Sequence, residues 1–130
     1  MSKPSVDQMT HKNRAKKRAQ KRGRWAEWLA RLYLRAHGRR ILAANCKTPV
    51  GEIDIIARRG NLIVFVEVKA RSDVDTAARS IGTNQKQRIQ RAAEYFLMQR
   101  PMLQTCDVRF DVALVSGVLS LKYIPDAWRP

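Results

Sequence analysis

Residues 51–71 read GEIDIIARRGNLIVFVEVKAR, and their pattern constrains the fold more than any other part of the chain. Two apolar runs, 52–58 and 62–70, are rich in isoleucine and valine, which favour β-strands. The residues between them include Gly60, which tolerates the positive φ angles of tight hairpin turns. The segment therefore predicts a β-hairpin.

Three charged residues interrupt this hairpin. Asp54 lies in the first run, and Glu67 and Lys69 lie in the second. An isolated charge buried among apolar side chains costs several kcal/mol, so each must be paired, bound to a metal ion or turned to solvent. The hairpin is therefore where the sequence predicts chemistry.

The spacing of these residues permits them to meet. Side chains of a strand alternate between two faces, which puts Glu67 and Lys69 on the same face as Phe65. Asp54 lies six residues before Gly60 and Glu67 seven after it, so antiparallel pairing permits adjacency. Two carboxylates about 4 Å apart repel by roughly 4 kcal/mol at an effective dielectric near 20, so they require a cation. That cation is either Lys69, in an ordinary ion network on a half-exposed face, or a divalent metal ion.

Two helices are predicted around the hairpin. Apolar residues recur at three- and four-residue steps from Arg24 to Ala36, and Gly38 is placed to end that helix. A second helix is predicted after Thr83 or Asn84 as N-cap and continues to Arg100, because Pro101 prevents continuation. The apolar stripe of the first helix is predicted to consist of Trp25, Trp28, Leu29, Leu32, Tyr33 and Ala36. Its tryptophans, like Trp128, are interpreted as core or lid residues in preference to base-stacking platforms.

Three further strands complete the predicted sheet. Residues 40–46 suit a short strand, and residues 107–115 and 118–124 follow the second helix. In 107–115, Asp111 shares a face with Arg109, which favours a structural ion pair over a catalytic role. The order of elements predicts an α/β fold in which helices flank a central, mixed, five-stranded sheet.

The 130 residues correspond to one domain and an arm. Residues 1–24 contain nine Lys or Arg and one Asp, while the chain as a whole has a net charge of +15. Residues 1–22 have almost no large apolar side chain and are predicted to form a disordered basic arm before a domain at 23–130. The arm has two interpretations, a solubilising tail or an electrostatic tether to phosphates.

The charge of the chain predicts a polyanionic partner. Nucleic acid fits best, with DNA favoured over RNA, because the arm lacks the apolar face with which an interfacial helix binds a membrane. Apolar stretches of the roughly 20 residues needed to cross a bilayer are absent from the sequence, and so is a secretory signal pattern. We therefore expect a cytoplasmic protein without a membrane partner.

Motifs along residues 23–128 resemble those of the bacterial YraN family, and more distantly those of archaeal Holliday junction resolvases. Both resemble the restriction-endonuclease-like superfamily, which is known by its (P)D...(D/E)xK motif. Ile53 replaces the proline of that signature. The matching segments are Gly23 to Ala30, Tyr33-Leu34, Ala44-Asn45, Gly51-Glu52-Ile53-Asp54, Phe65-Val66-Glu67-Val68-Lys69, Lys86-Gln87 and Arg109-Phe110-Asp111.

The resemblance implies a restriction-endonuclease-like fold and a metal-dependent endonuclease that hydrolyses DNA phosphodiesters, at branched or damaged structures. Asp54 and Glu67, with the carbonyl of Val68, are implied ligands of Mg²⁺ or Mn²⁺. Glu27 is implied to complete the metal shell directly or through water. Lys69 is implied to position the attacking water or to neutralise charge on the phosphate.

The implied nucleic-acid contacts lie outside the hairpin. Lys86 and Gln87 begin the second helix, where backbone N–H groups favour anions. The other residues assigned to nucleic-acid binding are Arg71, Arg88, Lys16, Lys17 and Arg18. Relatives that cut junctions imply a homodimer. Two alternatives stay open, a non-catalytic nucleic-acid binding module on a nuclease scaffold and an RNA- or ribosome-associated protein that binds mainly through its arm.

Overall fold

The computed structural model describes residues 23–70 and 81–130. After a helix at 23–36, the elements are β1 (Arg40–Thr48), β2 (Gly51–Arg59), β3 (Leu62–Ala70), α3 (Thr83–Met98), a short 3-10 helix (Pro101–Leu103), β4 (Asp107–Ser116) and β5 (Ser120–Trp128). In the described ranges, no helix is both long and apolar enough to cross a bilayer.

The five strands form one sheet in the order β1-β2-β3-β4-β5. Neighbouring strands are antiparallel except β3 and β4, which are parallel, so the sheet is mixed as predicted. Parallel neighbours need a crossover connection, and α3 belongs to the segment that links β3 to β4. This architecture confirms the predicted α/β class and is compatible with a restriction-endonuclease-like fold.

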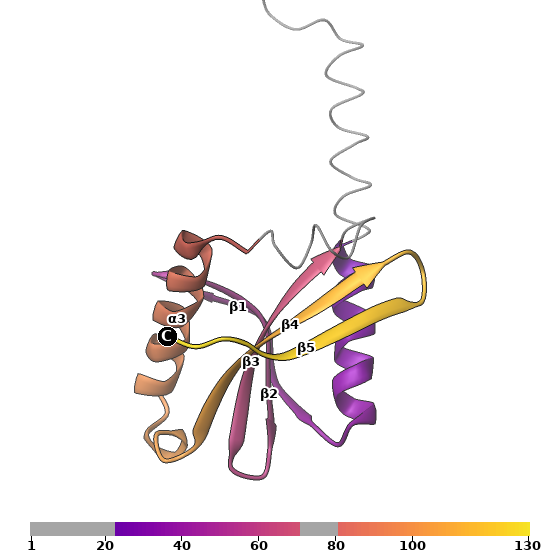
Figure 1. The fold of residues 1–130 in the computed structure, drawn as a ribbon. Coiled ribbons are helices and arrows are strands. Elements are labelled where there is room, and N and C mark those ends of the chain that lie inside the picture. The colour runs from indigo at the N-terminus through magenta and orange to yellow at the C-terminus, as the bar shows by residue number, and fades with distance from the viewer. Residues whose placement is uncertain (1–22, 71–80) are drawn as a thin grey trace, which may run out of the picture.

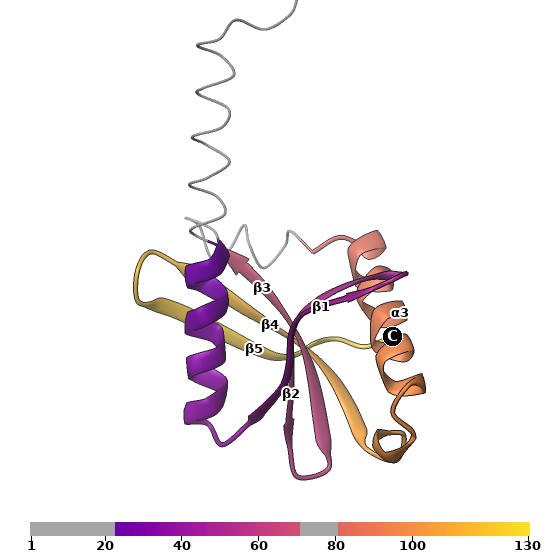
Figure 2. The same cartoon turned by 180° about the vertical axis from the view of Figure 1, so that it is seen from behind.

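The helices cover opposite faces of the sheet, as Figures 1 and 2 show from the two sides. Helix α3 packs Ile89 and Phe96 against Ile63 and Phe65. The helix at 23–36 packs Leu34 against Val64 on the other face. Because both faces are covered, β3 is buried along most of its length, and a charged residue within it needs a partner.

The predicted stripe of the first helix is wrong for Trp25, Trp28 and Leu32, although Tyr33 does pack against the core. The sheet-facing residues are Ala26, Ala30 and Leu34, which are buried, whereas Trp25 and Trp28 are exposed. Small alanine side chains allow the helix to approach the sheet closely, which the tryptophans would prevent. Glu27 lies beside this buried row and therefore faces the sheet.

Predicted turns are confirmed at two glycines. Gly38 adopts a φ of 77° at the end of the first helix. The Arg39 N–H donates to the Leu34 carbonyl at 2.9 Å, as in a Schellman motif. Gly60 has a φ of 59°, and Arg59 pairs with Leu62 across the hairpin.

Other boundaries differ from the predictions. The N-cap of α3 is Gly82, not Thr83 or Asn84, and the helix ends at Met98, before Arg100. The last strand begins at Ser120 instead of residue 118. Val118 lies in the turn before it, because the left-handed backbone of Gly117 (φ 70°) starts that turn.

Candidate functional site

Asp54 lies where β2 leaves its pairing with β3. Paired residues run from Arg59 opposite Leu62 to Ile55 opposite Val66, and continuing this register places Asp54 opposite Glu67. The Val68 N–H donates to the Asp54 carboxylate at 2.8 Å. The predicted adjacency of Asp54 and the Glu67–Lys69 segment is therefore confirmed.

Glu67 is held in a network of side chains. The residue is 8% exposed, and its carboxylate accepts a hydrogen bond from Gln85 Nε2 at 2.8 Å and lies 3.4 Å from Lys69 Nζ. Lys69 Nζ also donates to Gln85 Oε1 at 3.3 Å. Helix α3 thus supplies a neutral amide that fixes both charged side chains of β3.

Burial changes the protonation of both carboxylates. The pKa of Glu67 is raised to about 7, mainly by burial and next by the negative charge of Asp54, while Lys69 lowers it. Burial also raises the pKa of Asp54, although the Val68 N–H partly offsets the effect. Near neutral pH Glu67 therefore binds a proton in part of the molecules, and a nearby positive charge would displace that proton.

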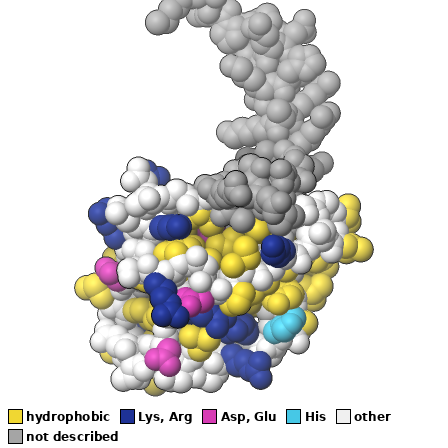
Figure 3. Space-filling model, viewed as in Figure 1, with side chains coloured by type: hydrophobic (Ala, Val, Ile, Leu, Met, Phe, Trp, Pro, Cys, Tyr) yellow, Lys and Arg dark blue, Asp and Glu magenta, His cyan; other side chains and the backbone are white. Residues whose placement is uncertain are grey.

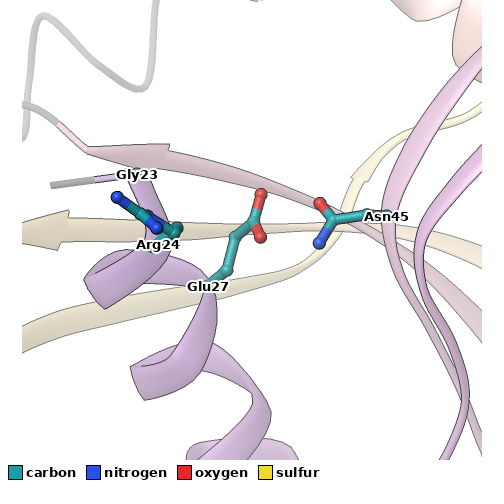
Figure 4. A pocket seen from close by; sticks show the side chains of 4 residues that line it. All are labelled: Gly23, Arg24, Glu27 and Asn45. Atoms are coloured by element: carbon teal, nitrogen blue, oxygen red, sulfur yellow. The ribbon is translucent and has the colours of Figure 1, made fainter. Parts of the chain in front are cut away.

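Glu27 lies across an open pocket from β1. The pocket has a volume of about 480 Å³ and is lined by Gly23, Arg24, Glu27 and Asn45. In Figure 4 the Glu27 carboxylate points from the helix toward the Asn45 amide. Burial raises the pKa of Glu27, the charge of Asp54 raises it further, and a hydrogen bond with Asn45 lowers it. Glu27 and Asp54 therefore influence each other electrostatically.

Asn45 shapes this side of the pocket through its backbone. It has a φ of 51°, which is uncommon outside glycine. In the pairing of β1 with β2, Ala44 lies opposite Ile55 and Cys46 lies opposite Ile53, whereas Asn45 between them is unpaired. The same register places the backbone of Asn45 opposite Asp54, while its side chain faces Glu27.

The carboxylates form a pair and not a compact triad. Across residues 23–70 and 81–130, no group of three or more His, Cys, Asp or Glu is spaced to hold a metal ion. Asp54 and Glu67 are in contact, whereas Glu27 lines the pocket together with Asn45. The pair offers oxygen ligands, which suit Mg²⁺ or Mn²⁺.

The predicted nucleic-acid residues on α3 are not part of this cluster. The Lys86 ammonium lies over the Trp128 ring, 5.9 Å from its centroid. Gln87 and Arg88 are exposed. Arg71, Lys16, Lys17 and Arg18 lie outside the described residues.

Sequence reasoning missed Gln85, although a signal was present. Gln85 precedes Ile89 by four residues and Ala92 by seven, which places it on the buried face of α3. A polar side chain on that face requires a hydrogen-bond partner, and the charged residues of the hairpin are such partners.

Asp111 is confirmed as a structural residue. It is fully buried and accepts hydrogen bonds from Arg109, the Tyr123 hydroxyl and the Asp126 backbone N–H. These partners tie β4 to β5 and satisfy the carboxylate completely.

Fold and site together define an α/β domain in which a strand hairpin carries a pair of carboxylates, one buried and one half-buried, and an adjoining lysine. This arrangement is compatible with a restriction-endonuclease-like fold. The chain belongs to the uncharacterised protein family UPF0102, whose model matches residues 26–115. This is the YraN family that the motifs resemble.

Relatives match along most of the chain. A UPF0102 protein of Paramagnetospirillum magneticum is 50% identical over 121 residues, covering 90% of this chain and 94% of its own. Another, from Maricaulis maris, is 48% identical and covers 90% of this chain and 92% of its own. A third, from Rhodopseudomonas palustris strain HaA2, is 50% identical over 79% of this chain and 80% of its own.

Proposed function

We propose that the protein is a metal-dependent endonuclease that hydrolyses DNA phosphodiesters. The observation that carries the proposal is the contact of the buried Glu67 carboxylate with the half-buried Asp54 carboxylate, with one ammonium group, Lys69, beside Glu67. A structural ion pair would match the charges one to one. Here two carboxylates share one ammonium group, and the negative charge of Asp54 raises the pKa of Glu67.

The donor set fits a hard divalent cation. Asp54 and Glu67 would hold Mg²⁺ or Mn²⁺ through carboxylate oxygens. The Val68 carbonyl is a third candidate ligand, because the N–H and C=O of a strand residue point to the same edge and the Val68 N–H faces Asp54. When bound, the ion would polarise a phosphate oxygen and lower the pKa of a coordinated water.

The remaining residues would orient the metal ion and neutralise the negative charge of the substrate. Lys69, fixed by Gln85 and Glu67, would place its ammonium against the negative charge that develops on the phosphate. Glu27 would reach the ion through water, because it lies close enough to Asp54 for the charge of Asp54 to raise its pKa but outside the contact between Asp54 and Glu67. The net charge of +15 would draw DNA to the domain.

A cleavage screen tests the proposal. The full chain is incubated with Mg²⁺ or Mn²⁺ and linear, branched or single-stranded DNA. We expect cleavage that chelation abolishes, and a loss of at least about a hundredfold in Asp54→Asn and Lys69→Ala, since each removes charge that acts in the transition state. Lys122→Ala is the matched control, because it removes an exposed lysine from β5.

Two outcomes would contradict the proposal. Cleavage that survives both Asp54→Asn and Lys69→Ala would assign the activity to another site or to a contaminant. Tight DNA binding without cleavage of any substrate would support the non-catalytic binding module. Sedimentation of the free chain and of its DNA complex tests the homodimer that forms part of this proposal.

A further inference from the structure

Two tryptophans on the helix at 23–36 face outward. Trp25 is 39% and Trp28 46% exposed. Their rings are stacked, with centroids 5.0 Å apart and an angle of 27° between the planes. Exposing two such large rings loses the stabilisation that burial would provide, so the arrangement points to a ligand instead of to folding.

The tryptophan pair is held in place by the β4–β5 turn. The Trp25 indole N–H donates to the Val118 carbonyl at 2.7 Å. Val118 and Leu119 of this turn are 69% and 80% exposed, and Leu32, one helical turn after Trp28, is 47% exposed. Figure 1 shows this turn beside the first helix, and Figure 3 shows apolar side chains gathered over it. The hydrogen bond to Val118 therefore fixes the orientation of the Trp25 ring, and Trp28 stacks on that ring.

Arginines run along the same helix next to the rings. Arg24 and Arg31 lie one turn before and one turn after Trp28, and Arg35 lies two turns after it. At about 100° per residue, these arginines fall between the tryptophans and Glu27. Arg24 also lines the pocket that contains Glu27. A row of positive charge thus connects the stacked rings with the candidate site.

We propose that Trp25 and Trp28 form a stacking site for unpaired nucleobases, with the arginine row along the phosphates. Planar aromatic rings beside positive charge match a single strand, which offers free base faces and an anionic backbone. Bases within a duplex are already stacked and do not offer their faces. The inference extends the proposed nuclease function, because it assigns a DNA with a single-stranded segment as substrate.

Binding measurements without metal test this site separately from cleavage. Fluorescence anisotropy with EDTA reports the affinity of the full chain for labelled oligothymidine of roughly 15 nucleotides and for a blunt duplex of equal length. We expect Trp28→Ala to weaken oligothymidine binding about tenfold, as for the loss of one base–aromatic stack. Duplex binding should change less than about twofold, because phosphates dominate it.

Conservative variants separate stacking from simple apolar contact. Trp28→Phe keeps an aromatic face and should retain most of the affinity, whereas Trp28→Leu keeps apolar area only and should behave like Trp28→Ala. Met98→Ala is the matched control, because Met98 is 73% exposed on α3, across the sheet. Circular dichroism confirms that each variant is folded.

Two results would overturn the inference. One is an oligothymidine affinity that Trp28→Ala leaves unchanged, and the other is an equal oligothymidine affinity of Trp28→Phe and Trp28→Leu. A concentration-dependent dimer that Trp28→Ala abolishes, without an effect on oligothymidine, would assign the surface to a second copy of the chain. These measurements involve no cleavage, so they test the stacking site even if the protein proves inactive. If the protein cleaves DNA but Trp28→Ala binds oligothymidine normally, the stacking site is refuted and the proposed nuclease function is not.

Discussion

At the scale of residues, the site depends on three polar side chains that satisfy one another inside an apolar sheet. Glu67 receives a hydrogen bond from Gln85 and lies beside Lys69, while Asp54 accepts the N–H of Val68. Each contact orients a charge that β2 or β3 would otherwise hold without a partner. Burial still disfavours the charged forms of Asp54 and Glu67, as their raised pKa values show.

The pKa of Glu67 predicts how stability depends on pH. This pKa is about 7 in the folded chain and near 4.5 when exposed, so the folded state binds more protons than the unfolded state between these values. The free energy of unfolding should therefore fall as pH rises from about 4.5 to 7, by at most about 3 kcal/mol. Urea unfolding with EDTA at several pH values measures this slope.

The same titration has an internal control. Glu67→Gln removes the titrating group and should flatten the slope. A free energy of unfolding that rises over this range in the parent chain, or a slope that Glu67→Gln leaves unchanged, would show that another group dominates.

Gln85 is predicted to act as a positioning residue. Gln85→Ala removes the amide that connects Glu67 and Lys69, so we expect kcat of the proposed cleavage to fall about tenfold while KM changes little, because misplaced groups mainly raise the barrier. Titration of Glu67 followed by NMR should show a changed pKa in Gln85→Ala. Glu94→Gln, at an exposed position of the same helix, should alter neither property.

At the scale of elements, the docking of α3 brings Gln85 to the hairpin. Gly51 begins β2, and a Cβ atom there would lie 3.0 Å from the backbone carbonyl oxygen of Arg88 on α3. Glycine therefore permits the strand and the helix to approach closely. This contact gives a physical role to the first residue of the Gly51-Glu52-Ile53-Asp54 motif.

Gly51→Ala should consequently push α3 away from β2. We expect a loss of about 1–3 kcal/mol in the free energy of unfolding, since the obstructing atom belongs to the backbone and yields little. Thermal and urea unfolding measure the effect. Gly23→Ala is the control, because a Cβ there meets nothing within 4 Å. Equal stability of Gly51→Ala and the parent would show that the helix shifts freely.

At the scale of the whole molecule, charge is spread over the arm and the domain. Residues 1–24 carry a net +8 of the total +15, so the remaining residues carry +7. The chain therefore has two basic regions, and DNA affinity should depend on both. The positive charge of the chain should speed its association with DNA, and added salt should weaken the binding.

Neutralising part of the arm tests this division. The triple variant Lys16→Gln, Lys17→Gln, Arg18→Gln should lower the slope of log affinity against log salt by up to about 3, if each residue contacts a phosphate. The charge-preserving variant Lys16→Arg, Lys17→Arg, Arg18→Lys is the control. Loss of all duplex affinity in the Gln variant would favour the interpretation in which the arm alone binds nucleic acid.

The sequence by itself determined the features that depend on neighbouring residues. Gly38 ends a helix and Gly60 forms a turn because of backbone freedom that glycine has in any context. The alternation in β3 placed Glu67 and Lys69 on one face, and counting from Gly60 permitted Asp54 to lie beside them, as the structure shows it does. The hairpin and its charged residues were therefore predictable.

Tertiary structure alone decided which surfaces meet. The first helix has two apolar rows, and the sheet buries the one with Ala30 and Leu34, because small side chains permit close approach, leaving Trp28 exposed. Gln85 reaches Glu67 because α3 docks against Gly51, more than 30 residues earlier in the chain. Local patterns predict elements, but the choice between two apolar faces depends on the shape of the surface against which a helix packs.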